Sequence, residues 1–328
     1  MDLRLSAEQQ QLVDTFAGLY AKEASSDRVR AAEPLGFDKA LWEHLSDLGV
    51  VTMAVPDAAG GWGASLLDLA LIAEQQGRFV APAPVIETQV TARMLASVGA
   101  PDDGAMTTLA LHPVVDGVAR LVPAAAVAER AVVSAGADLI VVPLADDNRV
   151  AVENLGAMPV ADVSVGDGKV IAHGPGASAA WHRAIDEYAV LTAAAVVGMA
   201  ARALELTTAY VADRQAWGKP IGSYQGVAHR LADAATAVDG ARLLAYEAAW
   251  AADEEPERSA ELAAMAFGFA AEAARDTTYW AVHLHGGYGF MLEFDVQLFY
   301  RRCRAWARVL AAPSTAYGWV ADHRYGAP

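Results

Sequence analysis

Residues 214–225 read Arg214-Gln-Ala-Trp-Gly-Lys-Pro-Ile-Gly-Ser-Tyr-Gln225 and separate two long alanine-rich segments. The glycines and the proline break both helical and strand periodicity, so this stretch predicts a loop from a helix that ends near Arg214 to one that begins near Tyr224. Helices are expected over about 179–213, 224–252, 257–285 and 294–310. Long helices with short connections favour an up-down bundle.

The loop contains residue types that suit phosphate binding. An arginine at a helix end beside a glycine loop can fork onto phosphate oxygens. Gln225, in the first turn of the next helix, offers an amide donor near the positive end of a helix dipole. An ordinary loop between helices would contain the same glycine and proline, so the residues alone leave both interpretations open.

A second glycine-rich stretch, His283-Leu-His-Gly-Gly-Tyr-Gly-Phe-Met-Leu-Glu293, follows the helix expected over 257–285. Paired glycines there are typical of a helix C-terminus, and they also let a ligand approach the backbone closely. Glu272, Asp276, Tyr279 and His283 share one face of that helix. If this face lined a cavity, desolvation would raise the pKa of Glu272 and suit it to act as a base; the ordinary alternative is a solvated glutamate.

The first 100 residues predict helices as well. Ser6-Ala-Glu-Gln9 has the form of a capping box, and apolar residues at helical spacing follow it. Further helices are expected over about 38–48, 65–76 and 88–98, with Gly49 and Gly77 ending the first two.

Short β-rich runs alternate with turn residues between 105 and 175, and their spacing of roughly ten residues predicts an antiparallel barrel or sandwich. The expected strands are Thr107–Leu111, Ala119–Val122, Ala131–Ser134, Leu139–Pro143, Arg149–Glu153 and Lys169–Ala172. The composition therefore predicts three domains, over 1–101, 102–177 and 178–328.

The composition of the chain argues against several classes of function. The 328 residues include 24 Lys and Arg against 40 Asp and Glu, a net charge of −16, which argues against nucleic-acid or membrane-surface partners. The single cysteine, Cys303, excludes an internal disulfide and fits a cytoplasmic protein. No apolar leader begins the chain, and the longest apolar run, 189–201, is too short to span a bilayer and predicts a buried helix.

Common motifs for metal, nucleotide and acyl-transfer chemistry are missing from the sequence. It has no H-E-x-x-H, C-x-x-C, P-loop, G-x-G-x-x-G or G-x-S-x-G pattern. No metal site is expected.

Three motifs in sequence order resemble the acyl-CoA dehydrogenase family. Val55-Pro-Asp-Ala-Ala-Gly-Gly-Trp-Gly, followed by Ala73-Glu-Gln-Gln-Gly-Arg, is similar to the family's V-P-E-x-x-G-G-x-G and A-E-x-x-G patterns. Residues 214–233 are similar to its R-x-x-F-G-x-P-I-x-x-x-Q-x-x-x-H-x-L-A-D stretch, and residues 286–293 to its G-G-x-G-[FY]-x-x-E stretch. The resemblance covers nearly the whole chain and implies an α+β fold with an N-terminal helical domain, a small middle β-barrel and a C-terminal four-helix bundle.

The resemblance also implies chemistry. It implies FAD as cofactor, an acyl-CoA thioester as substrate, α,β-dehydrogenation with a carboxylate as the base, and an electron-transfer acceptor. The flavin contacts that it implies come from Arg214, Trp217, Gln225, His283, Gly286 and Gly287.

Several family features are missing. The T-E-P-x-x-G-S-D and W-I-T/S segments, which belong to a complete flavin site, do not occur between 101 and 180. The frequent base of an E-G-T segment would fall in 310–315, which reads Leu-Ala-Ala-Pro-Ser-Thr and has no carboxylate. Other members place the base fourteen residues before the double glycine, where this chain has Glu272, and His283 stands where a glutamine is frequent.

This mixture resembles the shorter subunits of heteromeric acyl-CoA dehydrogenases of actinobacterial sterol side-chain degradation. In homomeric members one protomer holds the isoalloxazine and its neighbour contacts the ADP part of the same FAD. The chain keeps the neighbour's residues and lacks the isoalloxazine segments, so we predict a subunit that completes the flavin site of a longer partner in a heterotetramer. Two alternatives remain: a self-sufficient homomeric dehydrogenase with Glu272 as base, and a non-catalytic binding or scaffold protein on the same fold.

Overall fold

The computed structural model describes residues 4–100 and 104–326, and its elements follow the order helices, strands, helices. The N-terminal helices are α1 (Ala7–Glu23), α2 (Ser26–Ala32), α3 (Lys39–Asp47), α4 (Leu66–Arg78) and α5 (Val85–Ser97). The capping box predicted at Ser6 is confirmed, since Ser6 and Gln9 each bond the other's backbone N–H. The short helix α2 was not predicted.

The prediction that Gly77 ends its helix is wrong. Gly77 lies inside α4, and a Cβ built on it would lie 1.8 Å from the carbonyl oxygen of Ala195. Gly198 on the facing helix is as restricted, since its Cβ would lie 2.0 Å from the carbonyl oxygen of Glu74. These glycines therefore let two helices cross in close contact, a tertiary role that a sequence pattern does not distinguish from a helix stop.

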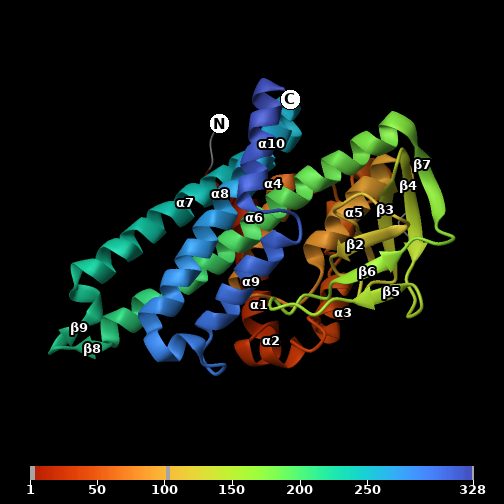
Figure 1. Cartoon of the computed structure of the whole chain (residues 1–328). Helices are drawn as coiled ribbons and strands as arrows, with labels where there is room; N and C mark the ends of the chain where they lie inside the picture. Colours follow the sequence, from red (N-terminus) through yellow and green to blue (C-terminus); the bar gives the residue numbers. More distant parts are fainter. Residues whose placement is uncertain (1–3, 101–103, 327–328) are drawn as a thin grey trace.

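Seven strands form two small sheets beside the helices (Figure 1). They are β1 (Thr107–Leu109), β2 (Val118–Val122), β3 (Arg130–Ala135), β4 (Asp138–Pro143), β5 (Arg149–Ala151), β6 (Ala161–Ser164) and β7 (Lys169–His173). One sheet has the order β1-β3-β4-β7 and the other β2-β6-β5. All pairs are antiparallel except β1 with β3, and β6 was not predicted. A small core of alanine and valine, among them Val122, Val133 and Val163, fills the space between the strands.

The C-terminal helices are α6 (Gly174–Asp213), α7 (Gln225–Glu254), α8 (Pro256–His285), α9 (Val296–Arg308) and α10 (Pro313–Tyr325). Helix α10 was not predicted; it follows the helix expected near 294–310. Pro313 suggests a break in the sequence, but proline is favoured in the first turn of a helix. The domain bounds 1–101, 102–177 and 178–328 stay a prediction.

Helix α6 organises the molecule. Its 40 residues correspond to about 60 Å, and it runs from the strands to the opposite end of the bundle (Figure 1). By length and composition alone α6 could cross a membrane, but 78% of its most apolar window is buried inside the protein. It is therefore the central core helix, as the apolar run 189–201 predicts.

Candidate functional site

The loop that begins at Arg214 folds as a tight hairpin at the far end of α6 (Figure 1). Its strands are β8 (Gln215–Ala216) and β9 (Lys219–Pro220), joined by Trp217 and Gly218. Both turn residues have positive φ, 49° and 79°, as a two-residue type I′ turn requires. Glycine adopts this conformation freely, whereas tryptophan does so at a cost of about 1–2 kcal/mol. The strained turn leaves the indole 92% exposed, and strain of this kind marks functional positions.

The glycine turn, defined here as residues 286–290, follows α8 at the same end of the bundle as this hairpin (Figure 1). Gly286 has φ 61° and ends α8, and a Cβ on Gly289 would lie 2.3 Å from the carbonyl oxygen of Val282. One residue before the turn, the ring of His285 stacks on Tyr210 with centroids 4.3 Å apart. The Tyr210 carbonyl in turn accepts the backbone N–H of Arg214 at 2.9 Å. The structure thus brings the two glycine-rich motifs together at one end of the bundle.

Aromatic and cationic side chains surround the two motifs. On α8, Tyr279, Trp280 and His283 contact one another through their rings. The Arg230 guanidinium of α7 lies 4.8 Å from the centre of the Trp280 ring, a cation–π contact. Lys219 lies in the same way over Tyr224, at 4.2 Å.

All six residues predicted to contact a cofactor are exposed. They are Arg214, Trp217, Gln225, His283, Gly286 and Gly287. The side chains of Arg214 and Gln225 make no hydrogen bond or ion pair within the described parts of the chain. We call this group with its flanking aromatic residues the bundle-end surface.

Glu272 lies elsewhere on α8. Its carboxylate accepts a hydrogen bond from the Tyr317 hydroxyl of α10 at 2.9 Å and lies 3.4 Å from Arg275, and its side chain is 41% exposed. Burial and the nearby Glu272 raise the pKa of Tyr317 to about 12. Glu272 therefore faces α10 and solvent, and the desolvation that the sequence hypothesis requires for a base is not present in the single chain.

A cavity of about 310 Å³ lies where the strands meet the bundle. Its walls include Leu111, Trp181, Ile185, Leu310 and Trp319. The segment 310–315, where the resemblance places a frequent base, contributes Leu310 and no carboxylate. Across this junction, Nε2 of His112 donates to the Val309 carbonyl at 2.9 Å.

The carboxylate in this cavity is Asp186 of α6, which the sequence analysis missed. Burial raises its pKa to about 6, against the opposing effect of His323 and His182. An acidic residue within a largely apolar helix is the signal that could have identified it. Cys303, by contrast, is buried, and burial raises the pKa of its thiol, so the described structure gives it no reactive character.

The cavity and the bundle-end surface lie far apart in one chain. Asp186 and Arg214 are 28 residues apart on α6, which corresponds to about 40 Å. This separation exceeds the length of an extended dinucleotide cofactor. A second cavity, of about 390 Å³, lies beside the buried Arg93–Glu187 ion pair and includes none of the six predicted cofactor residues. No group of three or more metal-ligating side chains is found in residues 4–100 and 104–326.

Comparison with known proteins identifies the family to which this architecture belongs. Residues 6–103 match the model of the acyl-CoA dehydrogenase N-terminal domain, and residues 175–308 match that of the C-terminal domain. A curated relative, acyl-CoA dehydrogenase IpdE2 from Mycolicibacterium smegmatis, is 32% identical over 94% of this chain and 96% of its own length. The chain belongs to the acyl-CoA dehydrogenase family. The resemblance in the three motifs and the α+β fold that it implies are therefore confirmed.

Two solved structures are similar along the whole chain. A Tcur3481-Tcur3483 steroid dehydrogenase variant has a TM-score of 0.88 and 26% identity, and covers 97% of each chain. The ChsE4-ChsE5 complex from Mycobacterium tuberculosis has a TM-score of 0.90 and 23% identity over all of both chains, which shows the same fold. The two domain matches end at 103 and resume at 175, so the strand region of this dehydrogenase lies outside both.

Proposed function

We propose that this chain is one subunit of a heteromeric, FAD-dependent acyl-CoA dehydrogenase and that its bundle-end surface contacts the ADP part of a flavin held by a longer partner. The missing T-E-P-x-x-G-S-D and W-I-T/S segments support a longer partner as the subunit that holds the isoalloxazine, and the separation along α6 supports a flavin shared between subunits. The bundle-end surface and the cavity beside Leu310 are about 40 Å apart, so one FAD cannot reach both in the same chain. A flavin at the bundle end therefore requires its isoalloxazine to lie in another subunit.

The residues at the bundle end fit an ADP group. The unpaired guanidinium of Arg214 can take the phosphates in a bidentate fork, and the exposed ring of Trp217 offers a stacking surface. Gly286 and Gly287 are exposed, and no atom lies within 4 Å of a Cβ built on either, so a ligand can approach the backbone. When bound, the flavin supplies the hydride acceptor for α,β-dehydrogenation.

The exposed apolar side chains support an obligate partner. Phe290, Leu292, Leu243 and Phe269 are all exposed on the helical part of the chain. Phe269 lies against α7 about 24 Å along α8 from its C-terminal end, so these side chains form more than one exposed apolar region, and exposed apolar regions are typical of protein interfaces. Two of the similar structures are named as pairs of subunits, and one is a steroid enzyme by its title. We extend both properties to this chain, as a heterotetramer with a longer homologue and an acyl-CoA substrate of steroid origin. We also propose transfer of electrons to a separate acceptor and a cytoplasmic location.

Glu272 can serve as a base only if the partner covers the face formed by α8 and α10. In the single chain its carboxylate is solvated and bonded to Tyr317. We therefore infer that the partner supplies the base.

Purification of the chain alone and with a longer homologue tests the proposal. We expect a colourless protein alone and a yellow complex after co-expression, with interfaces above about 2,000 Å² as in obligate assemblies. Light scattering measures the assembly. A yellow homo-oligomer would support the self-sufficient alternative, and a soluble colourless monomer that never pairs would support the binding or scaffold alternative.

A further inference from the structure

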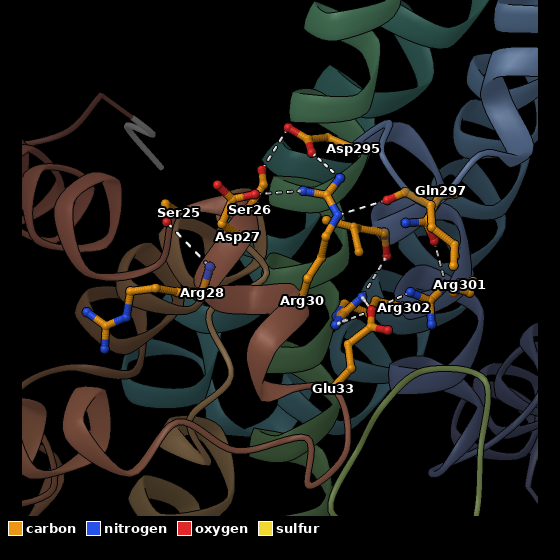
Figure 2. A network of polar contacts seen from close by, with 12 residues as sticks. Ser25, Ser26, Asp27, Arg28, Arg30, Glu33, Asp295, Gln297, Arg301 and Arg302 are labelled. Carbon is orange, nitrogen blue, oxygen red and sulfur yellow. Dashed lines mark hydrogen bonds and ion pairs between the residues drawn. The ribbon is translucent and has the colours of Figure 1, made fainter.

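The segment that follows the glycine turn is held by a helix of the N-terminal part. Nε of Arg30 in α2 donates to the carbonyl of Leu292 at 2.8 Å, and a second guanidinium nitrogen donates to Asp295 at 2.6 Å. The hydroxyl of Ser26 donates to the other carboxylate oxygen of Asp295 at 2.7 Å. Figure 2 shows Arg30 and Ser26 converging on Asp295 from α2. We call this set of contacts the α2 clamp.

Asp295 makes the clamp instead of a helix cap. It is the N-cap residue of α9, where an aspartate ordinarily accepts a hydrogen bond from a backbone N–H of the first turn and stabilises the helix by about 1 kcal/mol. Its side chain makes no such bond here: the backbone of Asp295 is itself helical, with φ −70° and ψ −27°, and both carboxylate oxygens bond α2. The local helix thus forgoes a cap in favour of a contact between distant segments.

Apolar packing holds this segment only in part: Phe294 stacks on Tyr288 of the glycine turn with ring centroids 4.8 Å apart, but the three residues between the turn and this ring are exposed. The side chains of Phe290, Met291 and Leu292 are 77%, 43% and 68% exposed, so they bury little surface within the chain. Upstream, the turn is held by the stack of His285 on Tyr210 and by the close approach of Gly289 to α8. Downstream, the clamp fixes the path from Leu292 into α9.

We propose that Arg30 is a positioning residue for the glycine turn, which it orients through Leu292 and Asp295 for contact with the partner's flavin. The proposal rests on the proposed function, because it gives the turn an ADP-binding role. Arginine suits this position, since its planar fork reaches a carbonyl and a carboxylate three residues apart at once, whereas a lysine ammonium is a single point charge. Arg30 itself touches no cofactor.

The test compares two arginines of the same short helix in the flavin-loaded complex. Arg30→Ala removes the clamp, and Arg28→Ala is the matched control, because Arg28 pairs with Glu23 and Asp38 inside the N-terminal part. Amide hydrogen exchange over residues 286–295 reports the turn directly. FAD dissociation constants report its consequence, and melting temperatures report general stability.

We expect Arg30→Ala to speed exchange over 286–295 and to weaken FAD about fivefold, the scale of one partly exposed ion pair. Arg28→Ala should leave both measurements unchanged. Arg30→Lys should weaken FAD by less than Arg30→Ala. Equal FAD affinity in Arg30→Ala and wild type, with Arg214→Ala still weakening FAD, would overturn the positioning role alone. If Arg214→Ala also leaves the affinity unchanged, the ADP-binding function itself fails.

Discussion

The bundle-end surface and the cavity beside Leu310 lie on the same helix and have opposite character. At the end of α6, Arg214 and Trp217 are exposed; the Arg214 side chain makes no hydrogen bond or ion pair with the described residues, and the Trp217 ring contacts Tyr224 at one edge. Near its start, Asp186 is enclosed with tryptophan and leucine, and its pKa is raised to about 6 by burial. The unpaired donors at the bundle end are available to a second molecule, whereas Asp186 lines a cavity formed by side chains of this chain.

The largest expected effect is at the bundle end. Arg214→Ala removes the bidentate pair with the diphosphate, and we expect FAD binding to the complex to weaken by about 1–3 kcal/mol. Arg214→Lys keeps the charge and loses the fork, so it should lie between Ala and wild type. Flavin fluorescence titration measures both. Unchanged FAD affinity in both variants would show that the bundle-end surface does not bind the cofactor.

Asp186→Asn tests the cavity beside Leu310, near the start of α6. The folded-state pKa of Asp186, about 6, lies above the ordinary value of 3.8, so ionisation disfavours the folded chain. This free-energy penalty on the folded state is absent below about pH 4 and grows as the pH rises to 6. Above pH 6 it stays at its full size. Asp186→Asn should remove it and stabilise the protein by up to about 2 kcal/mol at pH 7, measured by denaturant unfolding from pH 4 to 8. FAD affinity should not change; a loss of flavin would make the cavity part of the flavin site.

Trp217→Asn separates stability from binding. Asparagine tolerates the left-handed conformation at position 217, so the free chain should gain up to about 1 kcal/mol in unfolding free energy. The same change removes the exposed indole, and flavin occupancy of the complex should fall. Loss of stability together with unchanged occupancy would show that the indole packs in the assembly and does not serve the cofactor.

The smallest expected effect is at Glu272. Because its carboxylate is 41% exposed and bonded to Tyr317, we expect Glu272→Gln in the reconstituted complex to keep turnover within a few-fold of wild type. The measurement is dye reduction at constant flavin content. Loss of a general base costs at least about 100-fold, so a drop of that size would move the base from the partner to this subunit.

The motifs predicted much of the fold and the candidate site residues. Helical spacing, the capping box at Ser6 and the turn residues between 105 and 175 are local signals, and they correspond to observed helices and to six of the seven strands of the two sheets. The two glycine-rich stretches were identified as one site only through the family resemblance. Nothing in their own sequence places them together, because 60 residues of helix α7 and helix α8 separate them.

By itself the sequence determined the family, the helix–strand–helix order and the residues at the bundle end, because local periodicity and motif spacing are properties of neighbouring residues. Only the tertiary structure decided which of those residues meet and which stay exposed. Gly77 became a helix crossing point because Ala195 packs against it, and Asp186 acquired its raised pKa from the side chains that enclose it. Asp295 left its own helix uncapped and bonds Ser26 and Arg30 of α2 instead. Each of these outcomes depends on contacts between residues more than one hundred positions apart or on burial by several elements at once, and local sequence patterns contain neither.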